Sequence, residues 1–162
     1  MTGTYLPQLS KSKFLSGLQC LKRLYLETYH PELLLSADHS QQAPFDSGTA
    51  VGVLARDLFP GGRLVSEDFS AHQQAVEQTQ GIIKDQSVPS IYEAGFTFDG
   101  IRTSVDILKR LSRRGFALAE VKSSTSVKPE YIPDAAIQTY VAEGSDILVR
   151  NIFLIHINSS YV

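Results

Sequence analysis

The sequence has very few residues of the types that mark specialised structural classes. It contains no tryptophan, one methionine and one cysteine among 162 residues. The single cysteine, Cys20, excludes disulfide bonds within the chain and any metal site built from four of its own cysteines. No segment approaches the run of about 18 apolar residues that crosses a membrane, and the opening residues lack the apolar core of a signal peptide. We therefore expect a soluble cytoplasmic protein with no membrane association.

The composition is that of an ordinary globular domain. Hydrophobic residues make up 43% of the chain and charged residues 20%, and a chain of this length can bury a substantial core. We expect one domain over residues 1–162. The net charge of −2 does not by itself indicate a polyanionic partner, so any such partner needs a local argument.

Apolar residues recur at helical spacing in the first half of the chain. A first helix is expected to begin with Ser10 as its N-cap, to contain Cys20 and to end before His30. A second carries residues 51–58 and stops at Pro60, and a third opens at Ser70 and ends near Val88. The first two of these helices are expected to cover one face of a sheet together.

From residue 91 the pattern changes to strands. The segments IYEAGFTF and IRTSVDILKRL flank Asp99 and Gly100, a two-residue turn typical of hairpins. A third strand, FALAEVKSS, precedes a helix near Asp134–Glu143 and a last strand, VRNIFLIHIN. The order predicts an α/β fold in which helices flank a mixed sheet.

The hairpin brings charged residues together. A two-residue turn pairs Phe98 with Ile101 and places Glu93 directly opposite Asp106. Like charges about 5 Å apart destabilise a hairpin unless a cation lies between them. On the next strand Phe116, Leu118, Glu120 and Lys122 alternate onto one face, so we expect three carboxylates and an ammonium group on a shared face.

Such a cluster suits a hard divalent cation, Mg²⁺ or Mn²⁺. The ion can lower the pKa of a bound water and neutralise a phosphoryl group, while a neighbouring lysine steadies the attacking water. The cluster predicts hydrolysis of a phosphodiester bond. The alternative is a solvated sheet face with cross-strand salt bridges.

The succession of Glu93, Asp106, Glu120-Val121-Lys122 and Gln138 resembles the signature of the PD-(D/E)XK nuclease superfamily. Within it, the chain is most similar to the RecB-type nucleases, which include CRISPR-associated iron-sulfur exonucleases and a related bacterial family of unknown function. The likeness covers residues 10–162 and includes KFLSGLQCLKRLYLE, which resembles the segment with the first cluster cysteine, here Cys20.

The resemblance implies a restriction-endonuclease-like core, with helices around a mixed four-stranded sheet. It further implies that Asp106, Glu120 and the Val121 carbonyl hold the metal and that Glu93 is an additional acid. Lys122 is then the catalytic lysine, and Gln138 contacts the water network or the DNA backbone. The implied substrate is DNA.

Three departures from the family pattern lead to a second hypothesis. Arg56 stands where RecB-type enzymes usually carry a metal-binding histidine, and Ala142 stands where a tyrosine usually follows Gln138. The chain also lacks three further cysteines, so it cannot form an iron-sulfur cluster alone. It is then a minimal relative or the N-terminal part of a longer protein with further domains. The second hypothesis is a nucleic-acid-binding or assembly module that keeps the fold without cutting.

Local charge supports a DNA partner. Residues 101–128 contain seven Lys and Arg against two Asp and Glu, in a protein that is acidic overall. We expect Arg102, Lys128 and, from the second helix, Arg56 to contact DNA phosphates. The alternative interpretation of the basic residues is two polar turns that keep the protein soluble.

Overall fold

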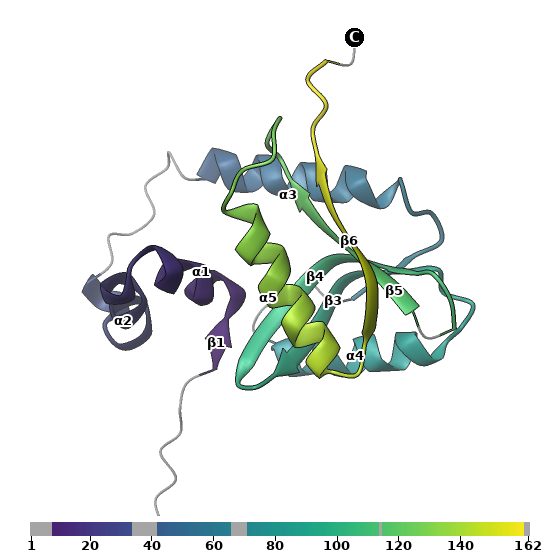
Figure 1. Ribbon diagram of the computed structural model, residues 1–162, viewed down its shortest axis with the longest axis horizontal. Coiled ribbons are helices and arrows are strands. Elements are labelled where there is room, and N and C mark those ends of the chain that lie inside the picture. The colour runs from purple at the N-terminus through teal and green to yellow at the C-terminus, as the bar shows by residue number, and fades with distance from the viewer. Residues whose placement is uncertain (1–7, 34–41, 66–70, 114, 161–162) are drawn as a thin grey trace, which may run out of the picture.

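The structure is a computed structural model that describes residues 8–33, 42–65, 71–113 and 115–160, with side chains from residue 48 onward in the second range. Within these residues the chain forms six strands and five α-helices (Figure 1). In chain order the elements are β1 (Leu9–Ser10), α1 (Lys11–Gln19), α2 (Leu21–Tyr29), a 3₁₀ turn (Pro31–Leu33), α3 (Gln42–Arg56), β2 (Arg63–Leu64), α4 (His72–Lys84), β3 (Ser90–Phe98), β4 (Ile101–Arg110), β5 (Gly115–Lys122), α5 (Tyr131–Gly144) and β6 (Leu148–His156).

The strands form one mixed sheet. Its order is β2-β3-β4-β5-β6, and β1 pairs with β4 away from this path. The β3–β4 and β4–β5 pairs are antiparallel, whereas β1, β2 and β6 each run parallel to their neighbours. The mixed sheet confirms the predicted α/β class. The four long strands are the predicted ones, and β1 and β2 were not expected because two residues are too short for a strand pattern.

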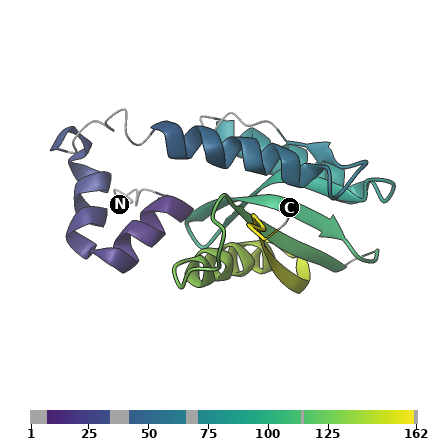
Figure 2. The ribbon, with the colours of Figure 1, turned by 90° about the horizontal axis from the view of Figure 1, so that it is seen from above.

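Helices cover both faces of the sheet. On one face, α4 and α5 contribute Ala75, Ile82, Val141 and Ala142 to a core with Ile91, Leu108 and Leu118. On the other face, Ala55 of α3 packs with Tyr92, Ile107 and Ala119. Figure 2 shows α3 and α5 on opposite sides of the sheet. The sheet therefore separates two apolar cores, one on each face. Polar side chains of the strands have to lie where neither core covers the sheet.

The predicted hairpin has the predicted register. Phe98 pairs with Ile101, and the pairing continues to Ser90 and Lys109. Asp99 and Gly100 have φ angles of 49° and 72°, the left-handed values that a two-residue turn of this kind needs. Aspartate and glycine tolerate these angles better than most residues, so the turn sequence sets the register.

The N-terminal helix differs from its prediction. Ser10 is the N-cap, and its hydroxyl accepts a hydrogen bond of 3.3 Å from the Lys13 N–H. The helix ends at Gln19, because Cys20 takes an extended conformation with φ of −163° and ψ of 116°, and a second helix begins at Leu21. The prediction that Cys20 lies inside one continuous helix is therefore wrong. Apolar spacing continues across the break, which is why the pattern did not reveal it.

The remaining helices lie close to their predicted positions. Helix α3 ends at Arg56, four residues before Pro60, and α4 runs from His72 to Lys84. Ser70, the expected start of α4, lies outside the described residues. Helix α5 begins at Tyr131, three residues before the expected Asp134, so Pro133 lies in its first turn, where a proline is tolerated. No helix in the described ranges has both the length and the apolar character to cross a membrane.

Candidate functional site

The site lies where β4 and β5 separate. Their ladder runs from Arg110↔Phe116 to Ile107↔Ala119, and the next residues in register are Asp106 and Glu120. Instead of continuing the ladder, the Asp106 carboxylate accepts a hydrogen bond of 2.7 Å from the Val121 N–H. The side chain of Asp106 thus takes the place of a backbone acceptor. This fixes the carboxylate in the gap between the strands.

Glu93 and Asp106 interrupt the alternation of side chains in the hairpin. Tyr92 and Ile107 belong to the core beneath α3, whereas Ala94 and Val105, on the far sides of the two acids, belong to the core beneath α5. Glu93 has a φ of 56°, a conformation that costs energy for a residue with a long side chain and that is often found at functional sites. The pairing register of β3 and β4 is the same on both sides of Glu93 and Asp106. Beyond these two acids, however, the strand residues point to the opposite face of the sheet from the one that regular alternation predicts.

This exchange overturns the prediction of one shared face. The Glu93 carboxylate binds Arg56 of α3 at 3.2 Å and accepts a hydrogen bond of 3.3 Å from Ser104. Glu120 instead faces α5. Asp106 lies between the two acids and within electrostatic reach of both. The carboxylates therefore approach the gap from opposite sides of the sheet.

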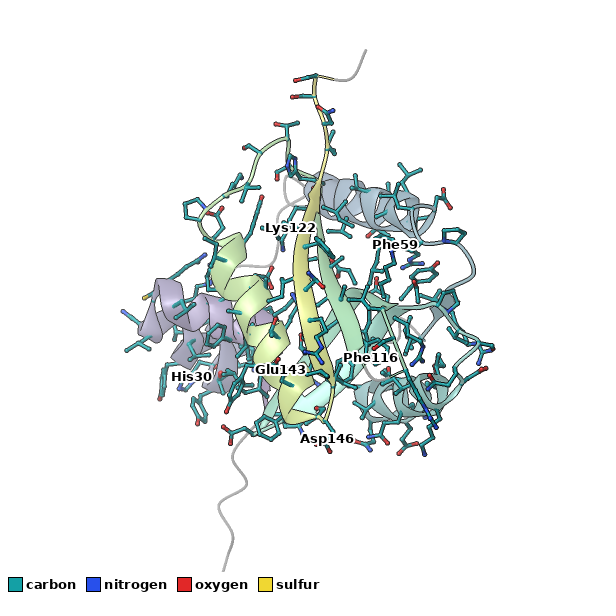
Figure 3. All side chains as sticks on the ribbon, turned by 45° about the vertical axis from the view of Figure 1, so that its right-hand side comes forward. His30, Phe59, Phe116, Lys122, Glu143 and Asp146 are labelled. Carbon is teal, nitrogen blue, oxygen red and sulfur yellow. The ribbon has the colours of Figure 1, made fainter. Side chains whose placement is uncertain are left out.

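Glu120 is the most enclosed acid of the site. Its side chain is 2% exposed, and its position follows from alternation with Phe116 and Leu118, which lie in the core beneath α5. One oxygen accepts from Lys122 at 2.6 Å, and the other accepts from Gln138 at 2.5 Å. Lys122 lies at the far end of β5 from Phe116 (Figure 3). The predicted Glu120, Lys122 and Gln138 are thus brought together.

Helix α5 supplies a further acid one turn before Gln138. Asp134 and Gln138 are four residues apart on the same buried side of the helix, 3% and 0% exposed. Asp134 binds Lys122, and it accepts from Gln138 at 3.2 Å. Gln138 is therefore enclosed by protein groups rather than facing solvent. It positions Glu120, and the expected contact of Gln138 with a DNA backbone would need this enclosure to open.

Sequence reasoning missed Lys11 and Asp134. The Lys11 ammonium lies 3.2 and 3.4 Å from the two oxygens of Glu120 and 3.3 Å from Asp134. The signal for Asp134 was present, because an acid and Gln138 at helical spacing i and i+4 share a face. No local signal marks Lys11, which reaches the site from 109 residues away along the chain.

The charges of the site are unevenly compensated. Burial, then the negative charge of Glu120, raises the pKa of Asp106 to about 7, although Lys11 and the Val121 N–H oppose the shift. Burial would raise the pKa of Asp134, but Lys11 and Lys122 outweigh it and lower that pKa. Burial would likewise lower the pKa of Lys122, but Glu120 and Asp134 raise it above its ordinary value. Lys122 therefore stays an ammonium ion at neutral pH, whereas burial and Glu120 favour the protonated form of Asp106 in spite of Lys11.

The oxygen atoms of the site suit a small hard cation, but few side chains supply them. Within the described ranges, no three side chains of His, Cys, Asp or Glu come together as a metal site. Magnesium is commonly held by one or two carboxylates, with water and phosphate oxygens completing the shell. Asp106, Glu120 and the Val121 carbonyl are oxygen donors of this type, and the raised pKa of Asp106 marks a position that favours added positive charge.

The expected DNA-contacting residues lie in different settings. Arg56 is bound to Glu93, and its guanidinium lies 5.9 Å from the centre of the Tyr92 ring. The Tyr92 hydroxyl in turn donates to the carbonyls of Arg56, the last residue of α3, and of Phe59 just after it, which fixes that end of the helix to β3. Arg102 lies on β4 beside Ser10, and Lys128 is exposed in the loop before α5. Of the three, Lys128 is exposed, whereas Arg56 and Arg102 are half-buried.

The basic residues among 101–128 do not all lie near the carboxylates. Arg110 donates to the carbonyls of Ile83, Asp85 and Val88, so it fastens the end of α4 to the sheet. Arg113 lies in the β4–β5 turn, at the end of β5 away from Lys122. Arg114 lies outside the described residues. Arg110 therefore serves the scaffold, and the local charge near the carboxylates is smaller than the sequence count.

Cys20 is exposed at the junction of α1 and α2. It is the only cysteine of the chain, and the carboxylate site lies at the opposite end of α1. The resemblance of the segment around Cys20 to the iron-sulfur segment of the RecB-type nucleases is therefore supported by no second cysteine in the sequence. No family model matches this chain, and no curated protein sequence shows significant similarity to it.

Proposed function

We propose that the domain hydrolyses DNA phosphodiester bonds with the help of a divalent cation, as a nuclease of the PD-(D/E)XK type with a restriction-endonuclease-like core. The observation that carries the proposal is the convergence of Asp106, Glu120 and Lys122 at the gap between β4 and β5. Two acids on adjacent strands and a lysine two residues after the second acid are the groups that this chemistry needs. The raised pKa of Asp106, caused by burial and by the negative charge of Glu120, further supports the proposal, because a cation beside this acid would stabilise its ionised form.

The cation is Mg²⁺ or Mn²⁺, and when bound it supplies charge neutralisation and a more acidic water. Asp106, Glu120 and the Val121 carbonyl would hold it, with Glu93 as an additional acid beyond them. The water oxygen bonds to phosphorus and loses a proton to solvent, while the bond from phosphorus to the leaving oxygen breaks and that oxygen takes up a proton from solvent. Asp106 is the acid best placed to orient that water, because it reaches into the gap between the strands.

Lys122 acts as a fixed positive charge rather than as a base. Its pKa is raised by Glu120 and Asp134 against the effect of burial, so it carries a proton at neutral pH. An ammonium ion beside the phosphate stabilises the negative charge that builds up on its oxygens during attack. Asp134 holds Lys122, and Gln138 holds Glu120, so α5 keeps both reacting side chains in position.

A second candidate function is a module of the same fold that binds nucleic acid or assembles with other domains without cutting. The Arg56–Glu93 ion pair of 3.2 Å favours it, because Arg56 is a cation at the place where the resembling enzymes usually have a metal-binding histidine. A cation cannot ligate a metal, and here it neutralises one of the acids. Salt-dependent DNA binding without metal binding would support this second function.

The test measures cleavage of labelled single-stranded and double-stranded DNA in Mg²⁺ or Mn²⁺. Asp106→Asn and Lys122→Met should each lower the rate by about a hundredfold or more, in the range found when one group that stabilises a transition state is removed. Asp146→Asn is the matched control, because Asp146 is exposed beyond the far end of α5 (Figure 3). Cleavage that survives both site substitutions at the control rate would refute the proposed site.

A further inference from the structure

Lys11 is held in the site by its backbone. Leu9 and Ser10 form β1, which pairs with Ile101 and Arg102 of β4, and the Leu9 N–H donates to the Gly100 carbonyl at 2.9 Å. Ser10 then caps α1, so Lys11 is the first residue of a fixed helix. Its side chain reaches Glu120 of β5 and Asp134 of α5. The backbone therefore fixes the position of Lys11, unlike that of a mobile lysine on the surface.

The first turn of α1 is an unfavourable position for the positive charge of Lys11. The first turn of a helix presents unpaired N–H groups and favours negative charge, and α1 has no acid there. Its ammonium is also largely shielded, with a side chain 25% exposed. Both effects disfavour a cation at this position. The compensation comes from outside the helix, because Glu120 and Asp134 lie within 3.4 Å of its nitrogen.

The donors around Glu120 use all of its acceptor positions. A carboxylate has about four lone-pair directions, and Glu120 receives two contacts on each oxygen: one oxygen binds Lys122 and Lys11, and the other binds Gln138 and Lys11. A metal ion that ligates Glu120 must replace one of these donors. Lys122 and Gln138 lie at 2.6 and 2.5 Å, whereas Lys11 lies at 3.2 and 3.4 Å. Lys11 is the most weakly held of the three.

We propose that Lys11 is an internal counter-ion that a divalent cation displaces from Glu120. The inference rests on the proposed function, since it concerns the metal of that site. The exchange needs no movement of the backbone. Lys11 already contacts Asp134 at 3.3 Å, so its flexible side chain keeps one partner when it leaves Glu120. The lysine then lowers the affinity for metal in the free protein and leaves the acids neutralised until a metal arrives.

The test measures Mn²⁺ binding by titration calorimetry without DNA, on wild type, Lys11→Met and the control Lys22→Met. Lys22 is exposed on α2, so its replacement makes the same charge change away from the site. We expect Lys11→Met to bind Mn²⁺ about tenfold more tightly than wild type, because the ion no longer displaces charge-assisted hydrogen bonds. Lys22→Met should bind as wild type does. Lys11→Arg, which keeps the charge, should show no gain.

Circular dichroism checks the fold of each variant. If Lys11→Met does not fold, Lys11→Gln replaces it with the same expectation, since its amide is neutral. Equal or weaker Mn²⁺ binding in the neutral variants would overturn the inference while leaving the nuclease proposal in place. Tighter binding without any DNA cleavage would support the counter-ion and refute the nuclease. Absence of binding in every variant would overturn both.

Discussion

Gln138 of α5 donates a hydrogen bond of 2.5 Å to Glu120 of β5, and both side chains are almost completely shielded from solvent. The same amide nitrogen lies 3.2 Å from Asp134. A neutral donor thus separates two acids that would otherwise face each other. The amide of Gln138 is as important to the arrangement as the lysines, because it satisfies an oxygen without adding charge.

Replacing this amide by a carboxylate should destabilise the fold. Gln138→Glu places a third acid beside Glu120 and Asp134, and we expect a loss of about 3 kcal/mol in the free energy of unfolding at pH 8. Urea denaturation measures it. Gln80→Glu, on the exposed side of α4, is the control and should change stability by less than about 0.5 kcal/mol. Equal losses in the two variants would contradict the structure of this cluster.

Asp106 should make stability depend on pH. Its pKa is raised from 3.8 to about 7 in the folded protein, so the folded state holds this proton more tightly than the unfolded state. Stability contributed by the protonated acid is therefore lost as pH rises from about 4 to about 7. Asp106→Asn removes this loss, and its amide oxygen can still accept from the Val121 N–H.

The expected gain from Asp106→Asn is roughly 1–3 kcal/mol at pH 8 and near zero at pH 4, measured by urea denaturation with a chelator present. Asp146→Asn should show no such pH-dependent difference. A gain for Asp106→Asn that is the same at pH 4 and pH 8 would mean that the proton is not bound preferentially in the folded state.

Thr79 fastens α4 to β3 and provides a test of the scaffold. Its hydroxyl donates to the Ala75 carbonyl at 2.8 Å and accepts from the Gly95 N–H at 2.9 Å. Thr79→Val leaves that buried N–H without an acceptor, and we expect a loss of about 1–3 kcal/mol in thermal or urea unfolding. Thr139 is the matched control because its hydroxyl donates to the Ala135 carbonyl within α5. Thr139→Val should cost much less, and a larger loss there would be inconsistent with the α4–β3 contact.

Arg102 and Lys128 should contribute to DNA binding through salt-dependent contacts. If each neutralises one phosphate, Arg102→Ala and Lys128→Ala should each reduce the slope of log affinity against log salt by about 1. The measurement is fluorescence anisotropy with labelled DNA at several salt concentrations. Arg113→Ala, in the β4–β5 turn, should leave the slope unchanged. An effect confined to Arg113 would place the DNA at the other end of the sheet.

The sequence allowed most of the sheet to be predicted because its signals are local. Asp99 and Gly100 determined the hairpin, and the alternation of Phe116, Leu118, Glu120 and Lys122 correctly predicted that they share a face. The exchange of faces at Glu93 and Asp106 was not predictable, because period-two alternation assumes a regular strand. Glu93 breaks that regularity with its positive φ, and it turns toward α3 instead of joining Glu120.

The site was predicted less completely than the sheet, for reasons of distance along the chain. Glu120 and Lys122 lie two residues apart, so strand geometry alone brings them together. Lys11 reaches Glu120 only through the pairing of β1 with β4, and two residues of strand leave no periodic pattern. The pattern places Asp134 at the start of a helix, and its spacing from Gln138 indicates that both side chains face the same way.

The pairing of β1 with β4 also has a consequence for the order in which the protein is made. Lys11 leaves the ribosome long before the acids that receive it, since Glu120 and Asp134 lie more than a hundred residues later. A growing chain that stops short of α5 carries this lysine with no acid to bind. Charge balance around Lys11 is therefore reached only after β5 and α5 have been made.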